Sequence, residues 1–328
     1  MSAGILEHDR GVVWGTTWHK LPQYVQQETA VTFEQAHEVL DYPLEKAQLN
    51  YFPTGKYNTL QFAAGAIPVN AWAIIRADTD DVLVPAVGNR FTIVPNVDLL
   101  NTVKTQVLDP HPELDIESVG TLWNGQTNFV NVKLQDYVIP GDKSPHISRL
   151  MYYNPLGNGS YKVCAHNVRV VCNNTLQFAA GSASETIKIR HTKSAADKIA
   201  GAILSLSEIF GAIKQHREHM EHLVNQVINP VAMNSFLDQY IPCPEEDGPA
   251  HTRAIRARIE FAEKFEDGDD ALNNTALHSK YGLLQTVTYL LDHEDPVRGN
   301  DIASITWDGM VGQRATQKQI ALDLIDAL

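Results

Sequence analysis

Side chains that bind anions are concentrated in the middle of the chain. The candidate nucleic-acid-binding residues are Arg169, Asn173, Asn174, Lys188, Arg190, His191 and Lys193. Arg and Lys neutralise phosphate groups, and Asn and His donate hydrogen bonds to phosphate oxygens. A helix beginning near Ser194 would turn its first backbone N–H groups toward the same anion. The segment therefore predicts a binding surface for a phosphate backbone.

The same residues also allow a purely structural interpretation. Asn173 and Asn174 are typical of a turn in which the side chains bond to their own backbone. Arg190 could pair with a carboxylate of the acidic C-terminal half, because runs of basic residues are commonly solvated faces or ion-pair partners. The sequence leaves both interpretations open.

Charge is distributed unevenly along the 328 residues. The chain has 26 Lys and Arg against 39 Asp and Glu, a formal net charge of −13. Residues 142–198 nevertheless carry a net charge of +5, whereas the chain from residue 201 onward carries −10. The acidic total argues against a protein whose whole surface binds nucleic acid or an anionic membrane. A local basic surface remains compatible with this balance.

No residue pattern points to an enzyme or a cofactor. The chain lacks the glycine-rich phosphate-binding motifs and the GxSxG motif of hydrolases. His216, His219 and His222 are spaced three residues apart on a predicted helix, but they do not form the H-E-x-x-H zinc motif. Acidic clusters at 78–81 and 267–270 fall in predicted turns, where such residues are ordinary. We therefore expect no metal, no cofactor and no catalytic residue.

Cysteine usage and the N-terminus indicate where the protein resides. Cys164, Cys172 and Cys243 show no CxxC spacing, which favours a reducing compartment over a disulfide framework. Charged residues at 7–10 interrupt the stretch where a signal peptide would be apolar. No apolar run approaches the length of about 18 residues that a membrane span needs. We expect a soluble cytoplasmic protein without a membrane partner.

The first half of the chain predicts strands with a few helices. Thr32 and Gln35 form a capping box ahead of a helix near 33–41. Alternating or turn-bounded apolar runs predict the remaining elements. These are a hairpin over 71–87, a strand at 91–95, a helix at 97–107 capped by Asn96, and strands at 118–123, 127–134, 149–154 and 160–172. Together they predict an antiparallel sheet with helices on one side.

The second half predicts helices. From Ser194, apolar residues recur at alternating steps of four and three as far as Val227, which predicts one helix of about 35 residues stopped by Pro230. Helices at 251–266 and 276–292 are its predicted partners, and a last helix covers 316–328. The fold class is α+β, with a sheet domain at 1–192 and a helical region at 193–328 packed on it or continuous with it.

Several sequence segments, taken together, resemble those of a known family. They include Trp18-His19-Lys20-Leu21, IIRADTDDVLVPAVGNRFTIVPN at 74–96, HNVRVVCNNTL at 166–176 and YGLLQTVTYLLDH at 281–293. The chain resembles the phage/plasmid-like protein family, a domain of unknown function found in bacteriophage genomes, plasmids and laterally transferred islands. The resemblance implies a mobile-element setting and brings no catalytic residue. Pro22 departs from the family, which usually has a small residue there.

Charge pattern and resemblance together lead to a functional hypothesis. We expect a protein of phage or plasmid DNA metabolism that binds single-stranded nucleic acid, with recombination or strand annealing as its role. Because four or so cations on an acidic body bind weakly alone, self-association that aligns several copies is part of this hypothesis. The alternative is a non-enzymatic interaction protein or particle component that modulates a host factor.

Overall fold

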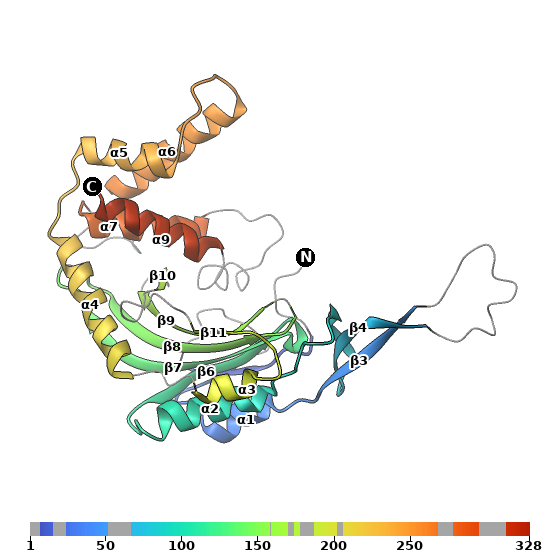
Figure 1. The fold of residues 1–328 in the computed structure, drawn as a ribbon. Helices are drawn as coiled ribbons and strands as arrows, with labels where there is room; N and C mark the ends of the chain where they lie inside the picture. The colour runs from blue at the N-terminus through green and yellow to red at the C-terminus, as the bar shows by residue number, and fades with distance from the viewer. Residues whose placement is uncertain are drawn as a thin grey trace, which may run out of the picture.

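The structure is a computed structural model. The described residues are 7–15, 24–51, 67–157, 159–169, 174–177, 187–201, 206–267, 278–294 and 313–328. Strands fall mainly in the N-terminal part and helices in the C-terminal part, which confirms the α+β class (Figure 1).

The main sheet of the described chain has eight strands. Its order is β10-β9-β8-β7-β6-β1-β2, and β11 also pairs with β9. The strands are β1 (Gly11–Trp14), β2 (Tyr24–Gln27), β6 (Asp115–Leu122), β7 (Thr127–Val138), β8 (Pro145–Pro155), β9 (Tyr161–Arg169), β10 (Asn174–Gln177) and β11 (Ile187–Ile189). All neighbours are antiparallel except β1 and β2, which are parallel. The predicted antiparallel sheet is therefore confirmed, with one parallel pair at its edge.

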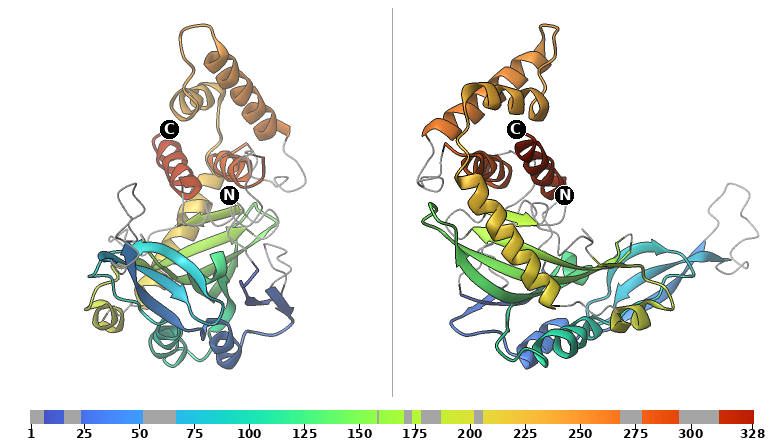
Figure 2. Two further views of the ribbon diagram at one scale, coloured as in Figure 1. Left: turned by 90° about the vertical axis from the view of Figure 1, so that its right-hand side faces the viewer. Right: turned by 60° about the vertical axis from the view of Figure 1, so that its left-hand side comes forward.

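A smaller sheet extends from one end of the main sheet (Figure 2). It consists of β3 (Leu44–Tyr51), β4 (Ile67–Arg76) and β5 (Asp81–Val87), all antiparallel. The hairpin predicted over 71–87 is confirmed. The strand predicted at 91–95 is wrong, because these residues form an irregular segment. Its backbone groups form hydrogen bonds that belong to no sheet. The Phe91 carbonyl accepts a hydrogen bond from the Lys46 ammonium, and the Thr92 N–H donates one to the His191 carbonyl.

Two helices cover one face of the main sheet. α1 (Phe33–Leu40) has the predicted Thr32–Gln35 capping box. α2 (Asn96–Val103) continues through a π-helical turn at Lys104–Leu108 and buries its apolar side as expected. Asn96 does not cap α2. Its side chain instead accepts a hydrogen bond from buried Asn128 at 2.6 Å, and Pro95 occupies the cap position.

The single long helix predicted from Ser194 to Pro230 is wrong. The segment forms two helices, α3 (Ala195–Gly201) and α4 (Leu206–Val224), and residues 202–205 lie outside the described part. α3 packs against α2 and β11, whereas α4 packs against α7 (Figure 1). Because the two pieces bury their apolar residues against different partners, the regular spacing did not require one rod. Pro230 begins α5 (Pro230–Tyr240), which was not predicted.

The remaining helices are close to the prediction. They are α6 (Pro249–Asp267), α7 (Lys280–Tyr289) with a π-helical turn at Leu290–Glu294, and α9 (Gln313–Asp326). α7 packs against α4, α6 and α9. One buried cluster joins Leu150 and Tyr161 of the sheet to Tyr281 and Ile325 of these helices. The sheet and the helical region therefore share a core. Among the described residues, no helix is long and apolar enough to cross a membrane.

Candidate nucleic-acid interface

The pairing of β11 with β9 places two lysines side by side. Lys188 lies directly opposite Lys162 in the register, flanked by the pair Ile189 and Tyr161. Ile189 and Tyr161 are buried in the core. Because successive side chains on a strand alternate between faces, Lys188 and Lys162 lie on the opposite face of the sheet. The Lys162 ammonium lies 5.2 Å from the centre of the Tyr153 ring.

Two further cations follow β11 along the chain. Arg190 and Lys193 come immediately before α3, and their side chains are exposed. We call Lys162, Lys188, Arg190 and Lys193 the basic surface. No ion pair within the described part of the chain involves any of these four residues. No described carboxylate of the acidic C-terminal half therefore pairs with Arg190.

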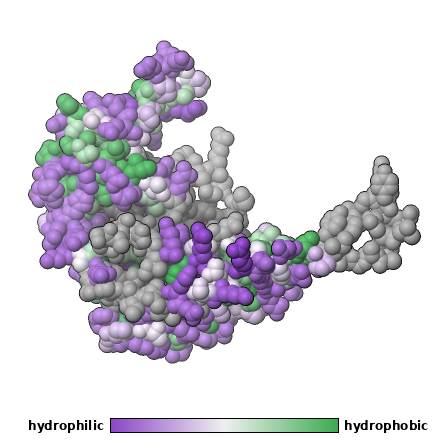
Figure 3. All heavy atoms as spheres, viewed as in Figure 1, coloured by the Kyte–Doolittle hydropathy of each residue, from purple (hydrophilic) through white to green (hydrophobic). Residues whose placement is uncertain are grey.

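The electrostatics of the basic surface favour an anion. Partial burial, and then the like charge of Lys188, lower the pKa of Lys162. A neighbouring cation disfavours the charged form of a lysine, and a bound anion would remove that penalty. Hydrophilic side chains cover the region where β11 approaches the small sheet (Figure 3). The arrangement can therefore hold phosphate groups in a row along β11 and the residues after it.

His191 has a different role from the one predicted. Its ring is buried, donates a hydrogen bond from Nε2 to the Pro155 carbonyl at 3.1 Å, and stacks on Phe91 with ring centres 4.8 Å apart. Burial lowers the pKa of His191, so the ring is neutral at pH 7. His191 therefore fixes the backbone between Arg190 and Lys193 instead of offering its ring to a ligand.

The remaining candidates lie elsewhere. Arg169 is opposite Asn174 on β10, at the end of β9 remote from Lys162. Seven residues separate Arg169 from Lys162, which corresponds to about 23 Å along a strand. β10 packs against α7 and α9, so this end is next to the C-terminal helices. Asn173 lies outside the described residues. The structure thus brings together Lys188, Arg190 and Lys193 but not the whole predicted set.

Lys162 was missed as a site residue. The signal was present in the sequence, because Lys162 stands between Tyr161 and Val163 in an alternating run. Alternation shows that Lys162 faces away from the core, but it does not say which strand lies beside it. The partner, β11, is 25 residues further along the chain, and only the register reveals the pairing.

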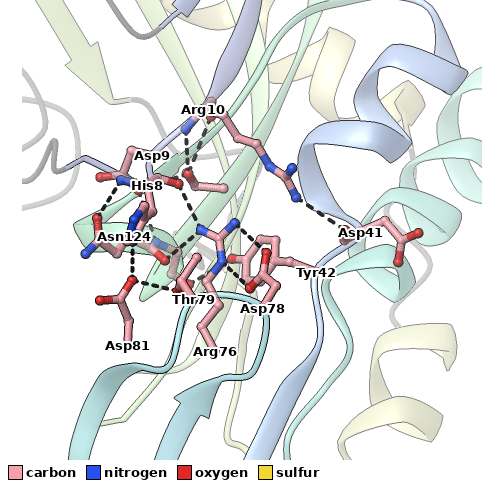
Figure 4. A network of polar contacts seen from close by, with 12 residues as sticks. His8, Asp9, Arg10, Asp41, Tyr42, Arg76, Asp78, Thr79, Asp81 and Asn124 are labelled. Carbon is pink, nitrogen blue, oxygen red and sulfur yellow. Dashed lines mark hydrogen bonds and ion pairs between the residues drawn. The ribbon is translucent and has the colours of Figure 1, made fainter.

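A second polar cluster joins the small sheet to the main sheet (Figure 4). Arg76 is buried, pairs with Asp78 at 2.8 Å and lies 4.3 Å from the centre of the Tyr42 ring. Asp81 accepts a hydrogen bond from Thr79 and contacts the His8 ring at 2.6 Å. Two carboxylates of the 78–81 cluster, those of Asp78 and Asp81, are therefore engaged by protein groups. No group of three or more His, Cys, Asp or Glu side chains among the described residues could hold a metal ion.

A third polar cluster is buried between the sheet and the C-terminal helices. His146 Nε2 lies 3.0 Å from the Tyr281 hydroxyl and 3.3 Å from Asp142 Oδ2, and the Tyr281 hydroxyl donates to the same carboxylate. Each of these side chains is at most 4% exposed. An Asp–His–Tyr cluster can move protons, but a substrate would have to enter the core to reach this one. It serves to fasten α7 to β8.

The three histidines of α4 do not converge. His216 is buried, whereas His219 contacts Asp326 and His222 contacts Gln226. Their side chains therefore turn to different partners, although their sequence spacing is regular.

The fold is α+β, and the basic surface is a group of cations at one edge of the main sheet that form no ion pair with any described residue. The chain belongs to the family described as a domain of unknown function, DUF932, whose model matches residues 84–317. A comparison with curated proteins found no match, and a comparison with solved structures found none either.

Proposed function

We propose that this protein binds single-stranded nucleic acid through the basic surface. The observation that carries the proposal is the row formed by Lys162, Lys188, Arg190 and Lys193, none of which pairs with a carboxylate of the described chain, in a protein of net charge −13. A group of cations without neighbouring carboxylates creates a local positive potential that attracts an anionic ligand even on an acidic protein. A phosphate backbone supplies a series of anions that the cations of the basic surface can neutralise.

The resemblance to phage/plasmid-like proteins supplies the setting of this proposal. In this proposal the protein acts in the DNA metabolism of a mobile element, in the host cytoplasm, with recombination or strand annealing as its role. Four contacts on one copy give only modest affinity, so self-association that aligns several surfaces along one strand belongs to the proposal.

Salt dependence of binding tests the proposal directly. We expect the affinity for a labelled single-stranded oligonucleotide, measured by fluorescence anisotropy, to fall with salt at a log–log slope near −3, about −0.7 for each of four contacts. Arg190→Gln should make the slope shallower by about 0.7.

Arg256→Gln is the matched control, because Arg256 is an exposed arginine on α6, away from the basic surface. The control should bind as the unaltered protein does. A folded protein that shows no salt-sensitive binding at about 50 mM salt, where electrostatic binding is strong, contradicts the proposal.

A second candidate function is protein–protein interaction. It is favoured by exposed apolar side chains on and beside α5 and α6, where Val227 and Val231 are 80% and 79% exposed and Ile259 is 53% exposed. Exposed apolar clusters commonly mark contact surfaces. Association that persists at high salt and is reduced by Val231→Asp would support this candidate.

A further inference from the structure

We propose that the nucleic-acid surface continues from β11 onto the small sheet, where Arg90 and Lys46 bind further phosphates and Trp72 stacks with a base. This inference rests on the proposed function. It adds the second half of the binding path and explains why the ligand would have unpaired bases.

The segment at 90–92 lies alongside the segment at 190–192. The Thr92 N–H donates to the His191 carbonyl at 3.2 Å, and the Phe91 and His191 rings are stacked with an interplanar angle of 21°. Arg90 and Arg190 each precede one member of this stacked pair. Both arginine side chains are exposed. The stacked rings therefore hold together two basic residues that are far apart in the sequence.

Lys46 adds a second cation to the same segment. Its ammonium donates hydrogen bonds to the carbonyls of Asn89 and Phe91 at 3.0 and 2.7 Å, the residues on either side of Arg90. In the part of the chain that the structure describes, neither Lys46 nor Arg90 forms an ion pair. The positive charge of the basic surface thus extends across the stacked pair without a neutralising carboxylate.

Aromatic rings accompany these cations. The Lys46 ammonium lies 4.8 Å from the centre of the Trp72 ring, and both Trp72 and Phe91 are partly exposed. Aromatic rings among cations are the components with which proteins bind single strands, because bases stack on the rings while cations follow the backbone. Bases inside a duplex already stack on one another and are not available to Trp72. The small sheet therefore favours single-stranded over double-stranded nucleic acid.

The test compares Arg90→Gln with Arg190→Gln and with the control Arg256→Gln. With Arg90 and Lys46 as two additional contacts, the salt slope of the unaltered protein should be near −4 instead of the −3 expected for four contacts. We expect R90Q to make this slope shallower by about 0.7, as R190Q does, and the double variant to make it shallower by about 1.4. Single-stranded DNA should quench tryptophan fluorescence of the unaltered protein, and Trp72→Phe should remove most of this quenching. Duplex DNA of the same length should bind more weakly and quench little.

The outcomes separate this inference from the proposed function. If R190Q has a shallower salt slope but R90Q has the same slope as R256Q, the binding surface ends at β11. The further inference is then overturned, while the proposed function stands. Base stacking on Trp72 is overturned if duplex DNA quenches the tryptophan fluorescence as much as single-stranded DNA does. It is also overturned if single-stranded DNA quenches W72F as much as it quenches the unaltered protein. If the unaltered protein shows no salt-sensitive binding, both fail.

Discussion

At the scale of single residues, His216 shows how burial changes the chemistry of a side chain. It is 8% exposed on α4. Burial, and then the nearby His146 and His219, lower its pKa to about 3. The folded protein therefore keeps His216 neutral, whereas the unfolded chain binds a proton below a pH of about 6.5. Stability conferred by the neutral ring is present above that pH and is lost as the pH falls toward 3.

We expect the free energy of unfolding to fall with pH by up to about 1.4 kcal/mol per unit below pH 6.5 through this residue alone. Because carboxylates also titrate in acid, the measurement compares the protein with His216→Gln, by urea denaturation at pH 7, 6 and 5. The variant should lose less stability than the unaltered protein over this range. Parallel pH profiles would show that His216 is not held neutral.

Arg76 is the residue on which the junction between the two sheets depends. Its guanidinium pairs with Asp78 and donates to the carbonyls of His8 and Asn124. The hydrogen bonds from Arg76 lower the pKa of Asp78.

Arg76→Met keeps most of the side-chain volume but removes every donor, so the partly buried carbonyls of His8 and Asn124 lose these hydrogen bonds. We expect a loss of about 3 kcal/mol in the free energy of unfolding, as for a broken buried pair. Asp78→Asn should cost less, because Asp78 is partly exposed and its asparagine can still accept one hydrogen bond. A Met variant as stable as the unaltered protein would contradict the assigned role of Arg76.

At the scale of elements, α4 shows which of the apolar residues that recur at steps of four and three between Ser194 and Val227 are buried. Ile213 and Met220 are each 1% exposed, Phe210 is only partly buried, and Val227 lies beyond the end of the helix. The spacing correctly identified the helical face. It overestimated the length over which that face is buried against other elements.

Ile213→Ala should cost about 2–5 kcal/mol in the free energy of unfolding, as expected for truncating a fully buried side chain. Phe210→Ala should cost less than the 3–5 kcal/mol typical of a buried aromatic. Val227→Ala, at an exposed position, is the control and should change stability by less than about 0.5 kcal/mol. Chemical denaturation measures all three, and an Ile213→Ala variant no less stable than the control would show that α4 is not packed on the core.

At the scale of the whole molecule, the sheet and the C-terminal helices share one core. Leu150 and Tyr161 of the sheet belong to the same buried cluster as Ile213 and Tyr281 of the helices, and the Asp142–His146–Tyr281 contacts cross between the two regions. A shared core couples the unfolding of its parts.

Trp307→Phe leaves Trp14, Trp18, Trp72 and Trp123, all in the N-terminal part, as the fluorescent reporters. We therefore expect tryptophan fluorescence of this variant to follow the same thermal transition as its far-ultraviolet circular dichroism, which is dominated by the helices. Two separate transitions would show that the helical region folds as an independent domain.

The sequence alone determined the elements whose signals are local. The Thr32–Gln35 capping box and the hairpin turn within 78–81 each depend on residues close together in the chain, so short-range rules were sufficient. The excess of cations in 142–198 was equally visible.

Only the tertiary structure decided which cations meet. Lys162 faces Lys188 because β11 returns to the edge of β9, and Arg90 joins Arg190 because Phe91 stacks on His191. Arg169 was separated from them because it lies at the other end of the same strand. Strand register and ring stacking bring together residues that are distant in the chain, and their energies come from the packed core rather than from neighbours in the sequence. A charge count along the chain therefore located the basic segment, but only the packing of the two sheets could define the surface.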